Sequence, residues 1–77
     1  MSRLLPVSGK EMCKILEMLG FQMVHQVGSH VRYVHPDGKK TVVPVHGNED
    51  LGTGLIKEIL KQGRISREMY EELRKKV

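Results

Sequence analysis

The sequence predicts a single α+β domain in which one helix, a three-stranded antiparallel sheet and further helices follow one another along the chain. Apolar residues recur at helical spacing near both ends of the chain. The middle changes to short apolar and polar runs that are separated by turn signals. A length of 77 residues leaves room for one small core, so residues 1–77 are treated as one domain.

The first helix is predicted at about residues 9 to 19. The segment Ser8-Gly9-Lys10-Glu11 has the pattern of a capping box, in which Ser8 is the N-cap and Glu11 reaches back to it. The apolar residues that follow recur at helical spacing: Met12, Ile15, Leu16 and Leu19. Gly20 then supplies a left-handed stop.

Three short strands are predicted at residues 21–26, 31–35 and 41–45, which together form an antiparallel meander. The segment Pro36-Asp37-Gly38-Lys39 indicates a tight turn between the second and third strands, because Gly38 can adopt a positive φ. Pro44 has no N–H to donate, so the third strand should lie at an edge of the sheet or carry a bulge there.

Helical signals return after the third strand. An apolar stripe ends at Gly63 and comprises Leu55, Ile56, Ile59 and Leu60. Asn48, Asp50 and Thr53 are alternative N-caps for this helix, and Ser66 caps a last short helix. The resulting order, α-β-β-β-α with a terminal helix, is that of the double-stranded RNA-binding domain, in which one sheet face packs against two helices and the other is free.

Composition and charge indicate which kind of partner and which compartment suit this chain. The net charge of +4 favours a polyanion as partner, although a solvated basic surface is the plainer interpretation. The single Cys13 excludes an internal disulfide and suits a reducing compartment. Because the chain has neither an apolar signal region nor a stretch of roughly 20 apolar residues, we expect a soluble, cytoplasmic protein.

The segment Gly28-Ser29-His30-Val31-Arg32-Tyr33 carries the main candidate site. His30 follows a turn and begins a strand, and on an extended backbone Arg32 projects from the same face. An imidazole exchanges protons near neutral pH, and a cation stabilises the charge that develops on a phosphate under attack. The alternative is a strand histidine that is exposed or hydrogen-bonded and has no chemical role.

Other polar residues extend this candidate site. Lys39 and Lys40 form a phosphate cradle with Arg32 in the functional interpretation, or a solubilising turn in the structural one. His46 is either a second proton carrier or a hydrogen-bonding residue of the connection after the third strand. Ser29 has no Asp-supported histidine beside it, so a serine-hydrolase site is not favoured.

Two further histidines, His25 and His35, are interpreted as surface residues. The four histidines lack the helical spacing and the accompanying carboxylate of common metal sites. We therefore expect no metal and no cofactor.

The chain resembles the HicA toxins, also described as YcfA-like proteins, of bacterial and archaeal toxin–antitoxin systems. The resemblance covers about residues 5 to 73. It rests on Ser8-Gly9-Lys10-Glu11, Leu19-Gly20-Phe21, Gly28-Ser29-His30, Arg32-Tyr33, His35-Pro36-Asp37-Gly38, Val43-Pro44-Val45-His46-Gly47 and Gly54-Leu55-Ile56-Lys57-Glu58-Ile59-Leu60.

The resemblance implies a metal-independent endoribonuclease that cleaves mRNA, with His30 as the catalytic histidine and His46 as the second family histidine. It also implies a HicB-like antitoxin that covers the active face and forms a heteromeric complex. The candidate RNA-binding residues are Ser29, Arg32, Lys39, Lys40 and His46. Two alternatives remain: a non-catalytic RNA-binding module of the same fold, and a small subunit whose basic face docks an acidic protein.

Overall fold

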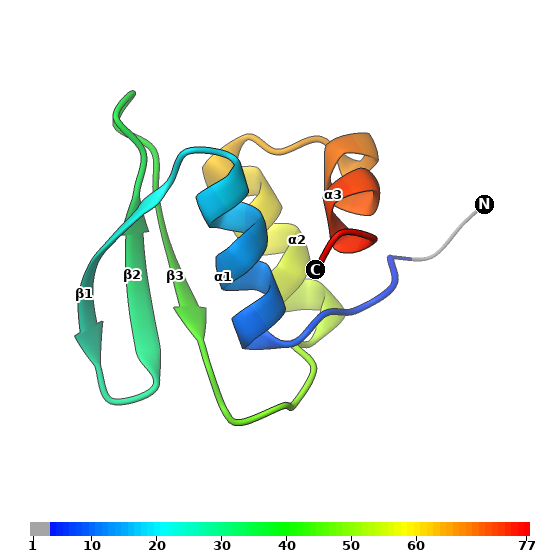
Figure 1. Ribbon diagram of the computed structural model, residues 1–77, viewed down its shortest axis with the longest axis horizontal. Coiled ribbons are helices and arrows are strands. Elements are labelled where there is room, and N and C mark those ends of the chain that lie inside the picture. Colours follow the sequence, from blue (N-terminus) through cyan, green and yellow to red (C-terminus); the bar gives the residue numbers. More distant parts are fainter. Residues whose placement is uncertain (1–3) are drawn as a thin grey trace.

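The computed structural model describes residues 4–77 and confirms the expected α+β fold (Figure 1). Its elements are α1 Gly9–Met18, β1 Gln22–Val27, β2 His30–Val34, β3 Lys40–Pro44, α2 Thr53–Gly63 and α3 Arg67–Arg74. The strands form one antiparallel sheet in the order β1-β2-β3. Helices α1 and α2 lie against one face of the sheet, and α3 lies beyond them on the side away from it (Figure 1).

The middle and third strands alternate between a buried and an exposed face. In β2, Val31 and Tyr33 are buried against the helices, and in β3 the buried residues are Thr41 and Val43. The residues between them project to the face that the helices leave uncovered. Strand β3 is an edge strand, so the expectation for Pro44 is confirmed.

The first strand differs from the other two, because all six of its residues are exposed. A register irregularity lies between Met23 and His25, where Met23 pairs with Tyr33 and His25 pairs with Arg32. The extra residue, Val24, therefore has no partner in the ladder. Strand β1 is the second edge strand of the sheet and pairs with β2 alone.

The capping box of α1 forms as predicted. The Ser8 backbone N–H donates to Glu11 Oε1 at 2.8 Å, and the Glu11 N–H donates to Ser8 Oγ at 3.2 Å. The helix ends before Gly20, whose φ of 94° is the expected left-handed stop. At the other end, a Cβ on Gly9 would lie 2.3 Å from the Pro44 carbonyl oxygen, so glycine permits α1 to approach the end of β3.

The start of α2 differs from the sequence expectation. None of Asn48, Asp50 and Thr53 is the N-cap; Gly52 occupies that position and no side chain caps the helix. The reason is a tertiary contact, because Asp50 forms an isolated β-bridge with Ser8. This bridge holds Asp50 in an extended segment two residues before the cap.

The terminal helix α3 begins as predicted at Ser66, whose Oγ accepts a hydrogen bond from the Met69 N–H at 3.0 Å. Tyr70 is fully buried, and its hydroxyl donates to the Leu5 carbonyl at 2.6 Å. The helix is thereby fastened to the segment that precedes α1. No helix within residues 4–77 is both long and apolar enough to cross a membrane.

Candidate functional site

The main candidate, His30, is the first residue of β2 and is exposed on the face that the helices leave uncovered. It follows a two-residue turn in which Gly28 has a φ of 59°. The Ser29 carbonyl accepts a hydrogen bond from the Val45 N–H at 2.7 Å, which ties this turn to the end of β3. Arg32 is exposed on the same face, so the expected alternation is confirmed.

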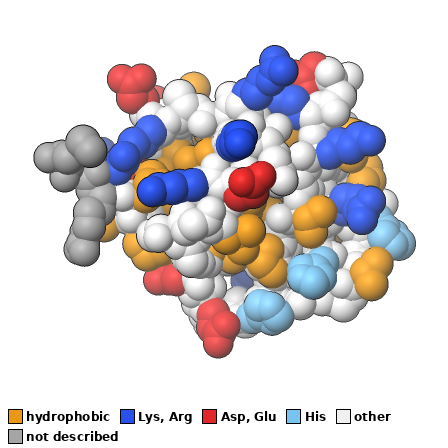
Figure 2. All heavy atoms as spheres, turned by 180° about the vertical axis from the view of Figure 1, so that it is seen from behind, with side chains coloured by type: hydrophobic (Ala, Val, Ile, Leu, Met, Phe, Trp, Pro, Cys, Tyr) orange, Lys and Arg blue, Asp and Glu red, His pale blue; other side chains and the backbone are white. Residues whose placement is uncertain are grey.

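A hollow of about 370 Å³ lies on this face of the sheet. It is lined by His25, Val27, His30, Arg32 and Val42, which come from all three strands. Figure 2 shows histidine side chains gathered beside hydrophobic side chains, with Lys and Arg side chains further along the same side of the molecule. We call these five residues the histidine hollow.

The histidine hollow includes His25, which sequence analysis interpreted as an ordinary surface residue. The register explains its position: Val27 pairs with His30, and His25 pairs with Arg32. Directly opposed residues of an antiparallel pair project from the same face. The Gly28-Ser29 turn was the available signal, because a two-residue turn fixes these pairings. The predicted first strand ends at residue 26, so that prediction did not include the pairing of Val27 with His30.

The two candidate lysines lie in different environments. Lys40 is exposed on the same face as Arg32: it pairs with Val34, and Arg32 pairs with Val42 two residues further along β3. Lys40 is therefore a diagonal neighbour of Arg32, at about 7–8 Å between backbone positions.

Lys39, by contrast, is held at the turn between β2 and β3. Its Nζ lies 2.8 Å from Asp37 Oδ2 and 5.8 Å from the centroid of the buried Phe21 ring. This turn is at the end of β2 opposite to His30. Of the expected cradle, only Arg32 lines the histidine hollow with His30. Lys40 lies on the same face but at the opposite end of β3 from the partner of His30, and Lys39 is held at the turn.

The position of His46 is outside the histidine hollow. This residue is exposed and lies two residues after Pro44, the partner of His30 in β3. Its backbone carbonyl accepts a hydrogen bond from the Glu49 N–H at 3.1 Å, so the backbone shapes the connection toward α2. Within residues 4–77, no hydrogen bond fixes the His46 ring beside His30.

His35 is not the plain surface residue that was expected, because its ring is partly buried and contacts Leu19, Phe21 and Asp37. Its Nε2 lies 3.2 Å from the Leu19 carbonyl oxygen, and its Nδ1 lies 3.2 Å from the Asp37 backbone nitrogen. The ring also stands edge-on to Phe21, with centroids 5.0 Å apart. His35 therefore joins the turn after β2 to the end of α1.

Side chains on the buried face hold β2 and β3 against the helices. The Tyr33 hydroxyl donates to Glu17 Oε2 at 2.7 Å. Burial, together with this hydrogen bond, raises the pKa of Tyr33 far above its usual range, so the hydroxyl remains a donor. In β3, the Thr41 hydroxyl donates to Gln62 Oε1 of α2 at 2.7 Å. These hydrogen bonds on the buried face hold β2 and β3 in place, and the side chains on their other face are therefore held in fixed positions.

A second hollow, of about 400 Å³, borders His30 on the side of α2. It is lined by His30, Val42, Pro44, Leu55, Glu58, Ile59 and Gln62. The side chain of His30 is therefore reachable both from the open sheet face and from the groove between β3 and α2.

This arrangement provides proton carriers and a cation on one accessible surface. An imidazole can take or give a proton in phosphodiester cleavage, and a guanidinium can stabilise the additional negative charge. Within residues 4–77, no three His, Cys, Asp or Glu side chains are grouped as ligands for a metal ion.

Comparison with known proteins gives one finding. The family model described as HicA toxin of bacterial toxin-antitoxin matches residues 9–65, from the start of α1 to just beyond α2. The comparison with curated proteins gives no match. The match covers most of the chain and every strand of the sheet, and the chain therefore belongs to the HicA family of toxins from bacterial toxin–antitoxin systems.

Proposed function

We propose that this toxin is an endoribonuclease that cleaves single-stranded regions of mRNA without a metal ion, with His30 as the general base. The observation that carries the proposal is the position of His30 and Arg32, both exposed on the helix-free face and both lining the histidine hollow. His30 removes the proton of a ribose 2′-hydroxyl, which then attacks the adjacent phosphorus. Arg32 stabilises the charge on the phosphorane oxygens.

The path of the RNA follows from the charges on the same face. Arg32 and Lys40 are diagonal neighbours on β2 and β3, so they form a short basic strip that leads from the histidine hollow toward the turn after β2. The hollow itself is partly lined by Val27 and Val42, against which a base or ribose can pack. The basic strip contacts the phosphates of the RNA, and the hollow receives the phosphodiester that is cleaved.

The test is cleavage of single-stranded RNA by purified protein. His30→Ala is expected to lower the cleavage rate by about 10²–10⁴-fold, the usual loss when a general base is removed. Because His30 is exposed, the circular dichroism spectrum and the melting temperature should change little. Gln22→Ala is the matched control, since Gln22 lies on β1, is exposed, and is paired with Val34 away from His30.

A folded His30→Ala protein that cleaves at the rate of the unmodified protein would refute the general-base role. Binding of RNA by the unmodified protein without any cleavage would instead support a non-catalytic RNA-binding module of this fold.

Membership in a toxin–antitoxin family also implies an antitoxin as partner. We propose that a HicB-like antitoxin covers the histidine hollow and blocks RNA sterically. Val27 lines the hollow and is 63% exposed, so it provides apolar area there for a partner. Hydrogen exchange with and without the antitoxin is the measurement. Protection of residues 22–34 is expected, whereas protection confined to α3 would refute direct occlusion.

A further inference from the structure

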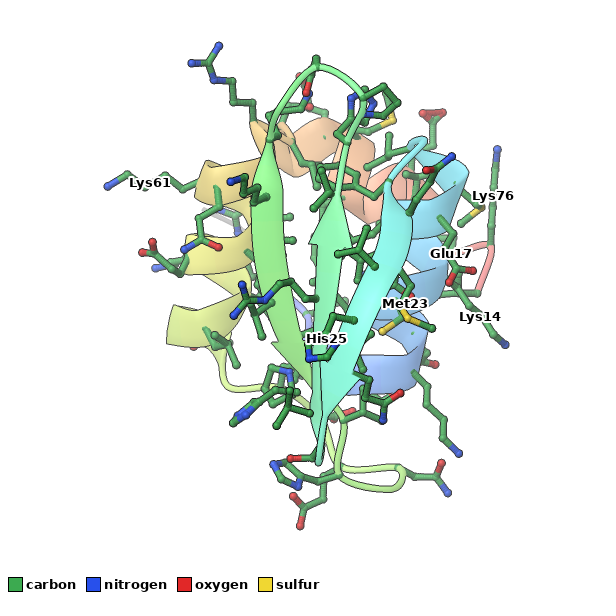
Figure 3. The ribbon with its side chains drawn as sticks, turned by 90° about the vertical axis from the view of Figure 1, so that its left-hand side faces the viewer. Lys14, Glu17, Met23, His25, Lys61 and Lys76 are labelled. Atoms are coloured by element: carbon green, nitrogen blue, oxygen red, sulfur yellow. The ribbon has the colours of Figure 1, made fainter. Side chains whose placement is uncertain are left out.

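Two imidazoles face the same hollow, but the proposed function assigns a step to only one of them. His25 pairs with Arg32, and His30 lies two residues before Arg32 in β2. His25 and His30 are therefore diagonal cross-strand neighbours, separated by about 7–8 Å at the backbone. In Figure 3, His25 lies in front of the exposed sheet face, where β1 meets β2.

Cleavage by internal attack requires two proton transfers on opposite sides of the phosphorus. One group takes the proton of the 2′-hydroxyl, and another gives a proton to the departing 5′-oxygen. A single imidazole cannot be on both sides during one displacement. Two hydrogen bonds of about 2.8 Å, one to each of these oxygens, can connect a phosphorane to two imidazoles at diagonal positions.

We propose that His25 is the second catalytic residue, the general acid that protonates the 5′-oxygen; this inference rests on the proposed function of His30. As the bond between the 2′-oxygen and phosphorus forms, His30 accepts the 2′-hydroxyl proton. As the bond between phosphorus and the 5′-oxygen breaks, His25 donates its proton to that oxygen. The products are a 2′,3′-cyclic phosphate and a 5′-hydroxyl, and exchange with water restores both imidazoles.

The other titratable groups nearby fit this role less well. The charged or titratable residues that line the two hollows beside His30 are His25, Arg32 and Glu58. A guanidinium donates hydrogen bonds in a fixed planar geometry, so Arg32 suits stabilisation of the charge on the phosphorane oxygens rather than proton transfer. Glu58 lies on α2 in the other hollow, where its Oε2 accepts from Gln62 Nε2 at 3.2 Å.

The decisive experiment compares two single-stranded RNA substrates. One has the ordinary 5′-oxygen at the scissile bond, and the other has a bridging 5′-sulfur in its place. A thiolate leaves without protonation far more readily than an alkoxide, because thiols are much stronger acids than alcohols. Removal of the general acid therefore harms cleavage of the oxygen substrate much more than cleavage of the sulfur substrate.

The expected results distinguish the two histidines. On the oxygen substrate, His25→Ala and His30→Ala should each lose about 10²–10⁴-fold in rate, whereas the control Gln22→Ala should not. On the sulfur substrate, His25→Ala should regain most of its loss and His30→Ala should not. Because every residue of β1 is exposed, His25→Ala should retain the circular dichroism spectrum of the unmodified protein.

Each contrary result has a separate meaning. If His25→Ala cleaves the oxygen substrate at the unmodified rate while His30→Ala is inactive, the inference about His25 fails and the proposed function stands. Equal impairment of His25→Ala on both substrates overturns its role as the acid. Failure of the unmodified protein to cleave either substrate overturns the proposed function and this inference together.

Discussion

Substitution of Gly9 tests how α1 positions the end of β3. An ideal Cβ at Gly9 would lie 2.3 Å from the Pro44 carbonyl oxygen and 2.9 Å from the Val45 Cα. Both are backbone atoms, which cannot rotate away as the end of a flexible side chain can. In Gly9→Ala, α1 and the end of β3 must therefore move apart. Since Pro44 pairs with His30, this movement reaches the candidate site.

The expected change in the free energy of unfolding of Gly9→Ala follows from two opposing effects. Alanine is favoured over glycine in a helix by about 0.8–1 kcal/mol, although less at the first turn. Overpacking of a well-packed site costs about 1–3 kcal/mol, and a contact with rigid backbone belongs at the upper end. We expect Gly9→Ala to lower the free energy of unfolding by about 1–2 kcal/mol. For a domain of this size, that corresponds to a fall in melting temperature of roughly 5–15 °C.

Gly54→Ala is the matched control, because Gly54 is also in the first turn of a helix. An ideal Cβ there meets nothing within 4 Å, and its φ is not positive. This variant should gain about 0.5 kcal/mol of stability from helix propensity alone. Urea unfolding followed by circular dichroism at 222 nm measures both variants. If Gly9→Ala is as stable as Gly54→Ala, the close approach of α1 to β3 is refuted.

Three further variants test separate contacts. Tyr70→Phe removes the hydroxyl that donates to the Leu5 carbonyl, so it should lower the free energy of urea unfolding by about 1 kcal/mol; an unchanged value would exclude a stabilising bond. Lys39, mainly through its hydrogen bond, lowers the pKa of Asp37 to about 2. A carboxyl with a lower pKa in the folded state stabilises the fold above its unfolded pKa of about 3.9 and loses this contribution as the pH falls through about 2. Asp37→Asn should therefore melt slightly below the unmodified protein at pH 6 and match it near pH 2, and a difference independent of pH would contradict this. Lys40→Ala should reduce the salt dependence of single-stranded RNA affinity by roughly 0.7 in log–log slope, with Lys39→Ala as the unaffected control; equal slopes in the two variants would contradict the assigned RNA path.

Local signals in the sequence predicted most of the fold. The capping box at Ser8 and Glu11, the stop at Gly20 and the cap at Ser66 each depend on neighbouring residues, and each forms as expected. The start of α2 could not be predicted in this way. It depends on a bridge between Asp50 and a residue more than forty positions earlier, which local capping preferences do not contain.

In the candidate site, too, some features depend on neighbouring residues and were predicted, whereas others depend on tertiary structure and were not. Exposure of His30 and Arg32 on one face follows from the period of a strand and was predicted. The membership of His25 and the separation of Lys39 from Lys40 depend on the strand register and on which side chains the turn holds. Register becomes readable from sequence only when the length of the turn is known, and the predicted strand ends concealed the two-residue turn before His30.

We propose that imidazoles on the exposed sheet face cleave RNA by internal attack, without a metal ion. Analysis of the product ends in excess EDTA tests this most directly. We expect undiminished cleavage, with a 2′,3′-cyclic phosphate or its hydrolysed 3′-phosphate on one fragment and a 5′-hydroxyl on the other. Cleavage that stops in EDTA, returns with a divalent cation and leaves a 5′-phosphate with a 3′-hydroxyl would contradict it, because those ends require attack by an activated water.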